Sequence, residues 1–330
     1  MSAIHVADAA AIALAAQRLR NGGLVAFPTE TVYGLGANAR DADAVRRIFA
    51  AKGRPENHPV IVHVEGLAGA EAWAAHMPDG ARALARAFWP GPLTLIVPRA
   101  PHVPDAVTGG QDSVGLRAPA HPVARALLAA FGDAIAAPSA NRFGHVSPTT
   151  ARHVAEDLGD KVELILDGGA CDVGIESTIV AFTSDAPMLL RPGGIAQDAI
   201  AAVLGRMPLA RDAAAPRASG TLTSHYAPRT PASLVASDAL YAELGQLTER
   251  DERVAVLALR AEPPEAFDGV WIHAPRDAAS YARMLYANLR ALDSADADAI
   301  LIERVPEGGE WIAIGDRIAR ATSGDADDRD

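Results

Sequence analysis

The chain has 330 residues, of which 49% are hydrophobic and 22% are charged, and this composition excludes a short disulfide-stapled peptide and a disordered polypeptide. Its 41 acidic and 30 basic residues give a net charge of −11, which argues against a protein that coats nucleic acid through a dominant cationic surface. Residues 1–150 carry 13 basic and 11 acidic side chains, so we expect an anion site in this half rather than in the acidic remainder.

Strand and helix patterns alternate through residues 1–208. The predicted helices are 8–20, 41–51, 121–131 and 149–158, and the predicted strands are 24–27, 60–64, 93–97, 134–137, 162–166, 177–182 and 187–190. This alternation predicts a layered α/β (α+β) domain that ends near Pro208.

Residues 209–231 have little apolar periodicity and are predicted to form a linker, and a segment of this length is often functional. Beyond it, a second domain is expected over residues 232–330. Its predicted strands are 254–259, 270–272 and 299–303, and its predicted helices are 278–292 and 311–321. This order predicts a small parallel sheet, followed by a disordered acidic tail at 324–330.

The chain has a single cysteine, Cys171, which cannot form an internal disulfide and therefore fits a reducing compartment. We find no run of about 18 apolar residues that would span a membrane, and the N-terminus does not read as a secretory signal. These features predict a cytoplasmic protein.

Residues 27–36, Phe-Pro-Thr-Glu-Thr-Val-Tyr-Gly-Leu-Gly, are predicted to be a strand end followed by a glycine-containing turn. Ligands of α/β proteins usually bind at such carboxyl ends of strands. The glycine spacing matches neither of the common nucleotide-binding fingerprints, so the pattern by itself fits an ordinary turn equally well.

Several cations follow predicted helices or strands. Lys52 and Arg54 flank a glycine and can converge on a polyphosphate, although a solvated helix end is the simpler reading of this motif alone. Arg117, Arg142 and Arg191 stand near other strand ends, and together these residues predict a shared anion site.

The motifs show no obvious covalent nucleophile, which favours a reaction driven by positioning and electrostatics, such as nucleotidyl transfer. Glu176 and Asp167 are candidates to hold Mg²⁺ together with substrate phosphates, although acidic residues of this region are mostly expected to be solvated.

Taken in chain order, seven motifs resemble those of YrdC-type threonylcarbamoyl-AMP synthases. They are 28–35 (PTETVYGL), 52–64 (KGRP…PVIVHV), 89–94 (WPGPLT), 114–119 (VGLRAP), 137–141 (APSAN), 177–179 (STI) and 191–193 (RPG). Residues 224–228 (SHYAP), 285–293 and 316–320 resemble, more loosely, the long two-domain form. The resemblance implies a twisted mixed sheet with a concave cavity and a smaller Rossmann-like C-terminal domain.

The resemblance also implies a reaction in which L-threonine, bicarbonate or CO₂, and ATP give threonylcarbamoyl-AMP and pyrophosphate. Mg²⁺ would accompany ATP, and no dedicated metal site is expected. The product would pass to the machinery that makes threonylcarbamoyladenosine in tRNA. Two readings from other classes are a double-stranded RNA-binding protein of the same fold and a carbamoyl transferase of hydrogenase maturation, whose zinc-finger motifs this chain lacks.

Site roles are implied by the same motifs, with Lys52 and Arg54 as the catalytic cations. The implied threonine-binding residues are Thr31, His63, Arg117 and Ser177. The implied ATP-binding residues are Lys52, Arg54, His58, Ser139, Asn141, Ser147, Arg191 and Tyr226. Tyr226 lies in the linker and would close over the cavity to shield the product from water.

Overall fold

The computed structural model describes residues 3–222 and 224–324, and the contacts divide the chain into two compact units. The first unit runs to Phe143 and resumes over Ser147–Thr221. The second comprises Gly144–Val146 and the described residues from Leu222 onward. These limits differ from the predicted boundaries at 208 and 231, because residues 209–221 make their contacts within the first unit. The predicted tail 324–330 lies, apart from Gly324, outside the described residues.

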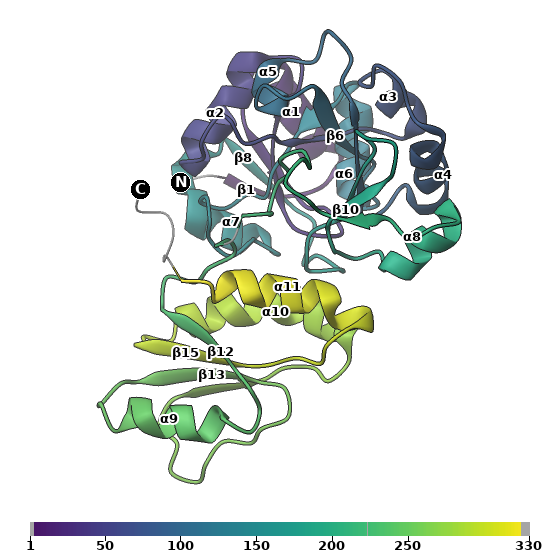
Figure 1. The fold of residues 1–330 in the computed structure, drawn as a ribbon. Coiled ribbons are helices and arrows are strands. Elements are labelled where there is room, and N and C mark those ends of the chain that lie inside the picture. The colour runs from purple at the N-terminus through teal and green to yellow at the C-terminus, as the bar shows by residue number, and fades with distance from the viewer. Residues whose placement is uncertain (1–2, 223, 325–330) are drawn as a thin grey trace. The chain divides into compact units, whose positions relative to one another are not determined.

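The first unit is built on a mixed sheet of eleven described strands (Figure 1), and this agrees with the predicted fold class. The strand order is β1-β8-β2-β3-β7-β4-β6-β5-β9-β10-β11. The strands are β1 (Ala3–Val6), β2 (Val25–Phe27), β3 (Gly34–Asn38), β4 (Ile61–His63), β5 (Leu93–Pro98), β6 (Ser113–Arg117), β7 (Ile135–Ala136), β8 (Leu164–Asp167), β9 (Thr178–Ala181), β10 (Met188–Arg191) and β11 (Leu209–Ala210).

Helices of the first unit pack on this sheet and bury their apolar faces in two clusters. They are α1 (Ala9–Arg20), α2 (Ala42–Lys52), α3 (Leu67–Glu71), α4 (Asp79–Phe88), α5 (Asp105–Thr108), α6 (Pro122–Phe131), α7 (Ala151–Leu158) and α8 (Gln197–Leu204), with a short 3₁₀ turn at Gly159–Lys161. Helices α1 and α6 cover one cluster around Leu19 and Leu128, while α2 contributes Ile48 and Phe49 to the other.

Helix α2 shows how local sequence positions two predicted site residues. The Asp41 carboxylate accepts hydrogen bonds from the Asp43 and Ala44 amides at 3.0 and 3.1 Å and starts the helix. Gly53, with φ of 64°, ends it in the left-handed conformation that glycine adopts without strain. Lys52 is therefore the last helical residue, and Arg54 begins the exit.

The predicted turn at 27–36 is shorter than expected, because Gly34–Asn38 form β3, which pairs antiparallel with β2. A Cβ on Gly36 would lie 2.8 Å from both Ile135 Cγ2 and Phe27 Cε1, so the strands approach closely only because the residue is glycine. The polar turn is confined to residues 28–33.

The second unit has a four-stranded parallel sheet in the order β12-β15-β13-β14, as the sequence predicted. Its strands are β12 (Ala232–Val235), β13 (Val254–Ala258), β14 (Val270–His273) and β15 (Ala299–Glu303), and its helices are α9 (Leu240–Thr248), α10 (Ala278–Asp293) and α11 (Ile312–Ala321), with a 3₁₀ turn at Gly309–Trp311. Helices α10 and α11 lie side by side on one face of this sheet and α9 covers the other (Figure 1). In the described parts of the chain, the helices are too short or too polar to cross a bilayer.

Candidate functional site

Neighbouring strands bring together three of the residues that are predicted to bind threonine. In the parallel pair of β4 and β6, His63 stands opposite Arg117. Thr31 lies in the turn after β2, and its Oγ1 accepts a hydrogen bond from Arg117 Nη1 at 2.9 Å. All three side chains are buried, so the pairing creates a polar site inside the sheet.

Glu30 is a member of this site to which the sequence analysis assigned no role. Its Oε1 accepts from Arg117 Nη2 at 2.6 Å, and its Oε2 accepts from the Ala120 amide at 3.0 Å. Although burial alone would raise it, the neighbouring guanidinium and these hydrogen bonds hold the pKa of Glu30 below its usual value. Its position beside Thr31 in the turn was the signal available in the sequence. The carboxylate therefore stays ionised and orients Arg117.

His63 is neutral at physiological pH. Burial and the nearby positive charge of Arg117 lower the pKa of His63 to about 3. Its Nδ1 atom and the Nε of Arg117 are buried, and neither has a hydrogen-bond partner among the described residues. Since buried polar atoms are nearly always hydrogen-bonded, these two nitrogens are suited to pair with a bound polar group.

Ser177, the fourth residue predicted to bind threonine, directly precedes β9 and links this group to a residue predicted to bind ATP. Its Oγ is 2.8 Å from Thr94 Oγ1. Arg191 donates to the Ser177 carbonyl through Nε at 3.1 Å and through Nη2 at 2.9 Å, and Nη2 also reaches Ser177 Oγ at 3.1 Å. Thr94 was not identified from the sequence.

Lys52 anchors the loop that carries two other predicted ATP residues. Its Nζ donates to the carbonyls of Ser139 and Asn141 at 2.5 and 2.6 Å and approaches Asn141 Oδ1 at 3.3 Å. Ser139 also forms a β-bridge with Gly34. These three acceptors match the three N–H bonds of an ammonium group. In this structure Lys52 holds the loop, whereas the sequence suggested that it converges with Arg54 on a polyphosphate.

Arg54 and His58 meet around one aromatic ring. The Arg54 guanidinium lies 5.7 Å from the Phe143 ring centroid, and the His58 ring meets Phe143 edge-on at 5.3 Å. Arg54 Nη2 also donates to the Pro59 carbonyl at 2.7 Å. Burial and the positive charge of Arg54 lower the pKa of His58, which favours its neutral form.

Ser147 follows the same loop, and its hydroxyl donates to Glu176 Oε1 at 2.6 Å. Both residues are buried. Arg142, which the sequence grouped with the other cations, is instead exposed and donates to the Asp157 carbonyl at 3.1 Å. The structure therefore does not bring Arg142 into this group.

Residues 217–219, from the predicted linker, lie over the strands of the site. The Ser219 carbonyl accepts from Arg191 Nη1 at 2.8 Å, and its hydroxyl donates to the Pro59 carbonyl at 3.0 Å. The Arg217 amide donates to Gln111 Oε1 at 2.7 Å. A cavity of about 20 Å³, enough for roughly one water molecule, lies against this segment. Pro59, Thr94 and Ile179 also line it, and none of the predicted threonine-binding or ATP-binding residues does.

Tyr226, the remaining member of the predicted ATP set, belongs to the second unit. It is buried there, with its ring centroid 5.6 Å from that of Tyr286. Its closure over a cavity stays a prediction.

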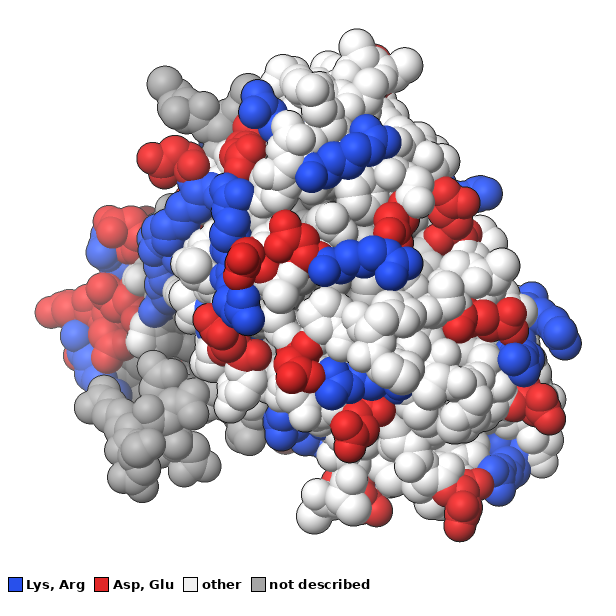
Figure 2. Space-filling model, turned by 90° about the horizontal axis from the view of Figure 1, so that it is seen from above, with Lys and Arg blue, Asp and Glu red and all other residues white. Residues whose placement is uncertain are grey.

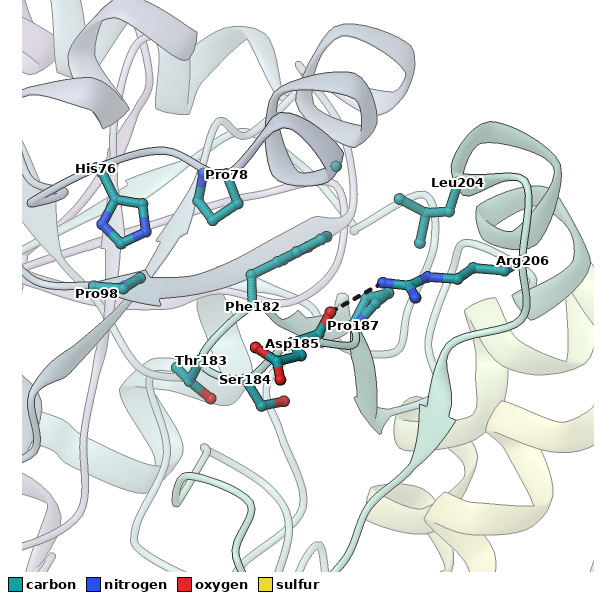
Figure 3. Close-up of a pocket in the computed structure, with 11 residues that line it drawn as sticks. His76, Pro78, Pro98, Phe182, Thr183, Ser184, Asp185, Pro187, Leu204 and Arg206 are labelled. Atoms are coloured by element: carbon teal, nitrogen blue, oxygen red, sulfur yellow. Dashed lines mark hydrogen bonds between the residues drawn. The ribbon is translucent and has the colours of Figure 1, made fainter.

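A larger hollow of about 650 Å³ lies elsewhere on the first unit and contains none of the predicted site residues (Figure 3). Phe182, Leu204 and Pro78 form its apolar part, and Arg206 Nη2 donates to the Asp185 carbonyl at 3.2 Å across one side. It offers no group of buried, convergent polar side chains, so size does not identify the site.

Charge is distributed differently inside the site and on the surface. Basic and acidic side chains are interspersed over the face that Figure 2 shows. By contrast, Lys52, Arg54, Arg117 and Arg191 are each at most 7% exposed. The cations that could bind an anion are therefore internal ones.

Comparisons with known proteins agree along most of the chain. The Sua5/YciO/YrdC family, described as "Telomere recombination", matches residues 17–193, and the threonylcarbamoyl-AMP synthase C-terminal domain matches residues 195–323. The chain is similar to a threonylcarbamoyl-AMP synthase of Pyrococcus abyssi, with 41% identity and coverage of 94% of each chain. It is 39% identical to that of Bacillus subtilis, over 95% of this chain and 93% of the relative.

A solved structure shows the same similarity in three dimensions. The crystal structure of Pyrococcus abyssi Sua5 complexed with L-threonine superposes with a TM-score of 0.90 at 38% identity. The match covers 98% of this chain and 97% of that one.

Proposed function

Because the chain belongs to the Sua5/YciO/YrdC family and carries the C-terminal domain of threonylcarbamoyl-AMP synthases, we propose a role in that synthesis for each residue of its buried site. The chain is an enzyme of the nucleotidyltransferase type that forms threonylcarbamoyl-AMP. Modification of tRNA to threonylcarbamoyladenosine is the function of this family.

The threonine site consists of Thr31, His63, Arg117 and Ser177. The observation that carries this assignment is the pair of buried nitrogens, His63 Nδ1 and Arg117 Nε, that have no hydrogen-bond partner within residues 3–222 and 224–324. A guanidinium binds a carboxylate through two parallel N–H bonds, so Arg117 would hold the carboxylate of threonine. The ion pair with Glu30 fixes the guanidinium before the substrate arrives.

ATP is bound by the residues at the loop ends beside this pocket. They are Lys52, Arg54, His58, Ser139, Asn141, Ser147 and Arg191. Arg54 and Arg191 would contact the phosphates, whereas Lys52 would act by holding the loop of Ser139 and Asn141 in place. Because the Ser219 carbonyl accepts from Arg191 Nη1, ATP would compete with this contact to reach that nitrogen.

The reaction proceeds in two steps that need no covalent enzyme intermediate. The threonine amine attacks the carbon of CO₂ and loses a proton, giving a carbamate. A carbamate oxygen then attacks the α-phosphorus of ATP, the bond to the β-phosphate oxygen breaks, and pyrophosphate leaves. Arg54 and Arg191 would stabilise the charge that develops on the transferred and leaving groups, since fixed cations in a dry site cost no reorganisation.

Mg²⁺ enters as the companion of ATP. Among residues 3–222 and 224–324 no three His, Cys, Asp or Glu side chains cluster as a metal cage. Mg²⁺ commonly binds through one or two carboxylates together with substrate phosphates, and Glu176, buried beside Ser147, is suited to this role. Bound there, the ion would neutralise part of the triphosphate charge.

Threonylcarbamoyl-AMP is a mixed anhydride that water hydrolyses, so it would pass directly to the tRNA threonylcarbamoyl-transferase machinery. Bicarbonate or CO₂ is the third substrate in the same proposal. A cytoplasmic location fits the buried free thiol of Cys171, which a reducing compartment maintains.

The test is to incubate the purified protein with ATP, labelled bicarbonate and L-threonine and to measure pyrophosphate. Release that requires both bicarbonate and threonine supports the function. Release with L-serine but not L-threonine, or no release, would contradict it.

Two variants test the site in the same assay. Lys52→Ala should loosen the loop and Arg54→Ala should remove a phosphate contact, so each should raise the KM for ATP about tenfold or more. Lys161→Ala, at the only other lysine, is the control because Lys161 is exposed. Unaltered KM values in both Lys52→Ala and Arg54→Ala would refute the assigned ATP site.

A further inference from the structure

The second unit contains a short piece of the chain that the proposed ATP site needs. Gly144–Val146 make their contacts with the second unit, although Asn141 precedes them and Ser147 follows them in the first. The conformation of this turn therefore affects the positions of the two proposed ATP-binding residues that flank it, Asn141 and Ser147.

The turn is held by a side chain of α10. Arg290 Nη2 donates to the Val146 carbonyl at 2.5 Å. On its other side the turn pairs with the segment after Leu222, through a parallel bridge between His145 and Ala227, and the Ala227 amide donates to the Gly144 carbonyl at 2.9 Å.

Leu222 and the segment 224–230 are in turn hydrogen-bonded to residues of α10 and α11. Asp293 accepts hydrogen bonds from the Thr230 amide at 2.8 Å and from Arg229 Nε at 3.1 Å. The side chain of Arg320 donates to the Leu222 carbonyl, and the Arg320 carbonyl accepts from the His225 amide at 3.3 Å. Each end of the segment thus has a partner on these helices.

Tyr226 fixes the middle of this segment. Its φ of 64° lies in the left-handed region that side chains rarely adopt, and its ring is buried. The guanidinium of the fully buried Arg317 lies 5.3 Å from the ring centroid, and Asp316 neutralises that cation at 2.5 Å.

We propose that the helix pair α10–α11 is a positioning platform, on which Arg290 and Asp293 hold the turn 144–146 and residues 224–230 in the conformation that ATP binding requires. Arg290 and Asp293 are positioning residues, since they act through the backbone of these segments. The motifs at 285–293 and 316–320 supply these contacts, which gives the second domain a part in the reaction. The proposal rests on the proposed function through its assignment of Asn141 and Ser147 to ATP.

The test combines steady-state kinetics with hydrogen exchange on the full-length protein. Arg290→Met removes the donor but keeps an unbranched apolar stem, and it should raise the KM for ATP about tenfold while leaving the KM for threonine within twofold. The exchange of the amides in residues 225–230 should become faster, because the pairing of Ala227 with Gly144 is released. Arg276→Met, at an exposed arginine of the same unit, is the matched control.

Asp293→Ala is the second variant and tests the other fastening should Arg290→Met not fold. It should speed exchange at Thr230 and raise the KM for ATP in the same direction. The platform is overturned if folded Arg290→Met or Asp293→Ala behaves like Arg276→Met in both measurements. The exchange measurement does not need turnover, so wild-type protein without pyrophosphate release would refute the proposed function alone.

Discussion

Arg117 shows how one residue can be prepared for an anionic ligand before that ligand binds. Its guanidinium pairs with Glu30 and Thr31, and its Nε is buried without a partner in the part of the chain that the structure describes. A guanidinium offers five N–H donors in a fixed plane, so one edge can bind the protein while another remains for a carboxylate. The orientation of Arg117 therefore depends on Glu30.

We predict that Glu30→Gln raises the KM for L-threonine about tenfold and changes kcat little, because the neutral amide orients Arg117 less firmly than the carboxylate does. Steady-state kinetics with threonine as the varied substrate measures this effect. Glu56→Gln, at an exposed glutamate, is the control and should match wild type. Equal KM values in both variants would show that Glu30 does not position Arg117.

His63 leads to a prediction about acid stability. Its pKa is about 3 in the folded protein against an ordinary 6.5, so the unfolded chain binds more protons at this residue between these values. Its contribution to stability is fully present above pH 6.5 and is lost as the pH falls toward 3.

The free energy of unfolding of wild type should therefore decrease as the pH falls from 6.5. His63→Gln, which carries no titrating ring, should show a smaller decrease over this range. Urea denaturation of both proteins at several pH values provides the measurement. Identical slopes would mean that His63 keeps an ordinary pKa in the fold.

At the level of elements, the close pairing of β2 with β3 shapes the turn that carries Glu30 and Thr31. Gly36 permits this pairing, since Ile135 and Phe27 occupy the space that a side chain would need. Strand spacing, more than turn composition, determines where the polar residues 28–33 lie.

We expect Gly36→Ala to lower the free energy of unfolding by about 1–3 kcal/mol, the usual cost of adding a methyl group to a filled interior. Chemical denaturation measures it. The control is Gly66→Ala, because a Cβ there meets no atom within 4 Å and the backbone is extended. A Gly36→Ala protein as stable as this control would contradict the tight packing of β3.

At the level of the whole molecule, the net charge is −11, and the cationic side chains of the proposed site are buried. Affinity for nucleic acid depends chiefly on Lys and Arg side chains that reach backbone phosphates. Buried cations such as Lys52 and Arg117 can serve a small substrate but cannot reach a duplex.

We therefore predict weak binding to a short RNA duplex, with little affinity left at about 200 mM salt. Fluorescence anisotropy at about 50 and 200 mM salt measures this binding. Tight binding that weakens steeply with salt would instead favour an RNA-binding role, and charge reversal of exposed arginines such as Arg18 and Arg142 would then locate it.

The sequence by itself determined the types of the elements that it predicted, the parallel sheet of the second domain and the motifs of the family. These properties depend on periodicity, capping residues and turn glycines, which act over a few positions; Asp41 and Gly53 at the ends of α2 are examples. Strands β6 and β12 and helices α4, α8 and α9 were not among the predicted elements. Strand β3 was missed because its glycines read as a turn, and pairing with distant β2 decided otherwise.

Only the tertiary structure decided which of the predicted cations share a site and what each one does there. Arg142 is exposed, Lys52 holds the loop of Ser139 and Asn141, and Glu30 forms an ion pair with Arg117. Tertiary contacts likewise divided the predicted linker between two units. Contacts between residues some ninety positions apart, such as Arg117 with Glu30, depend on strand order and register, which local sequence patterns do not encode.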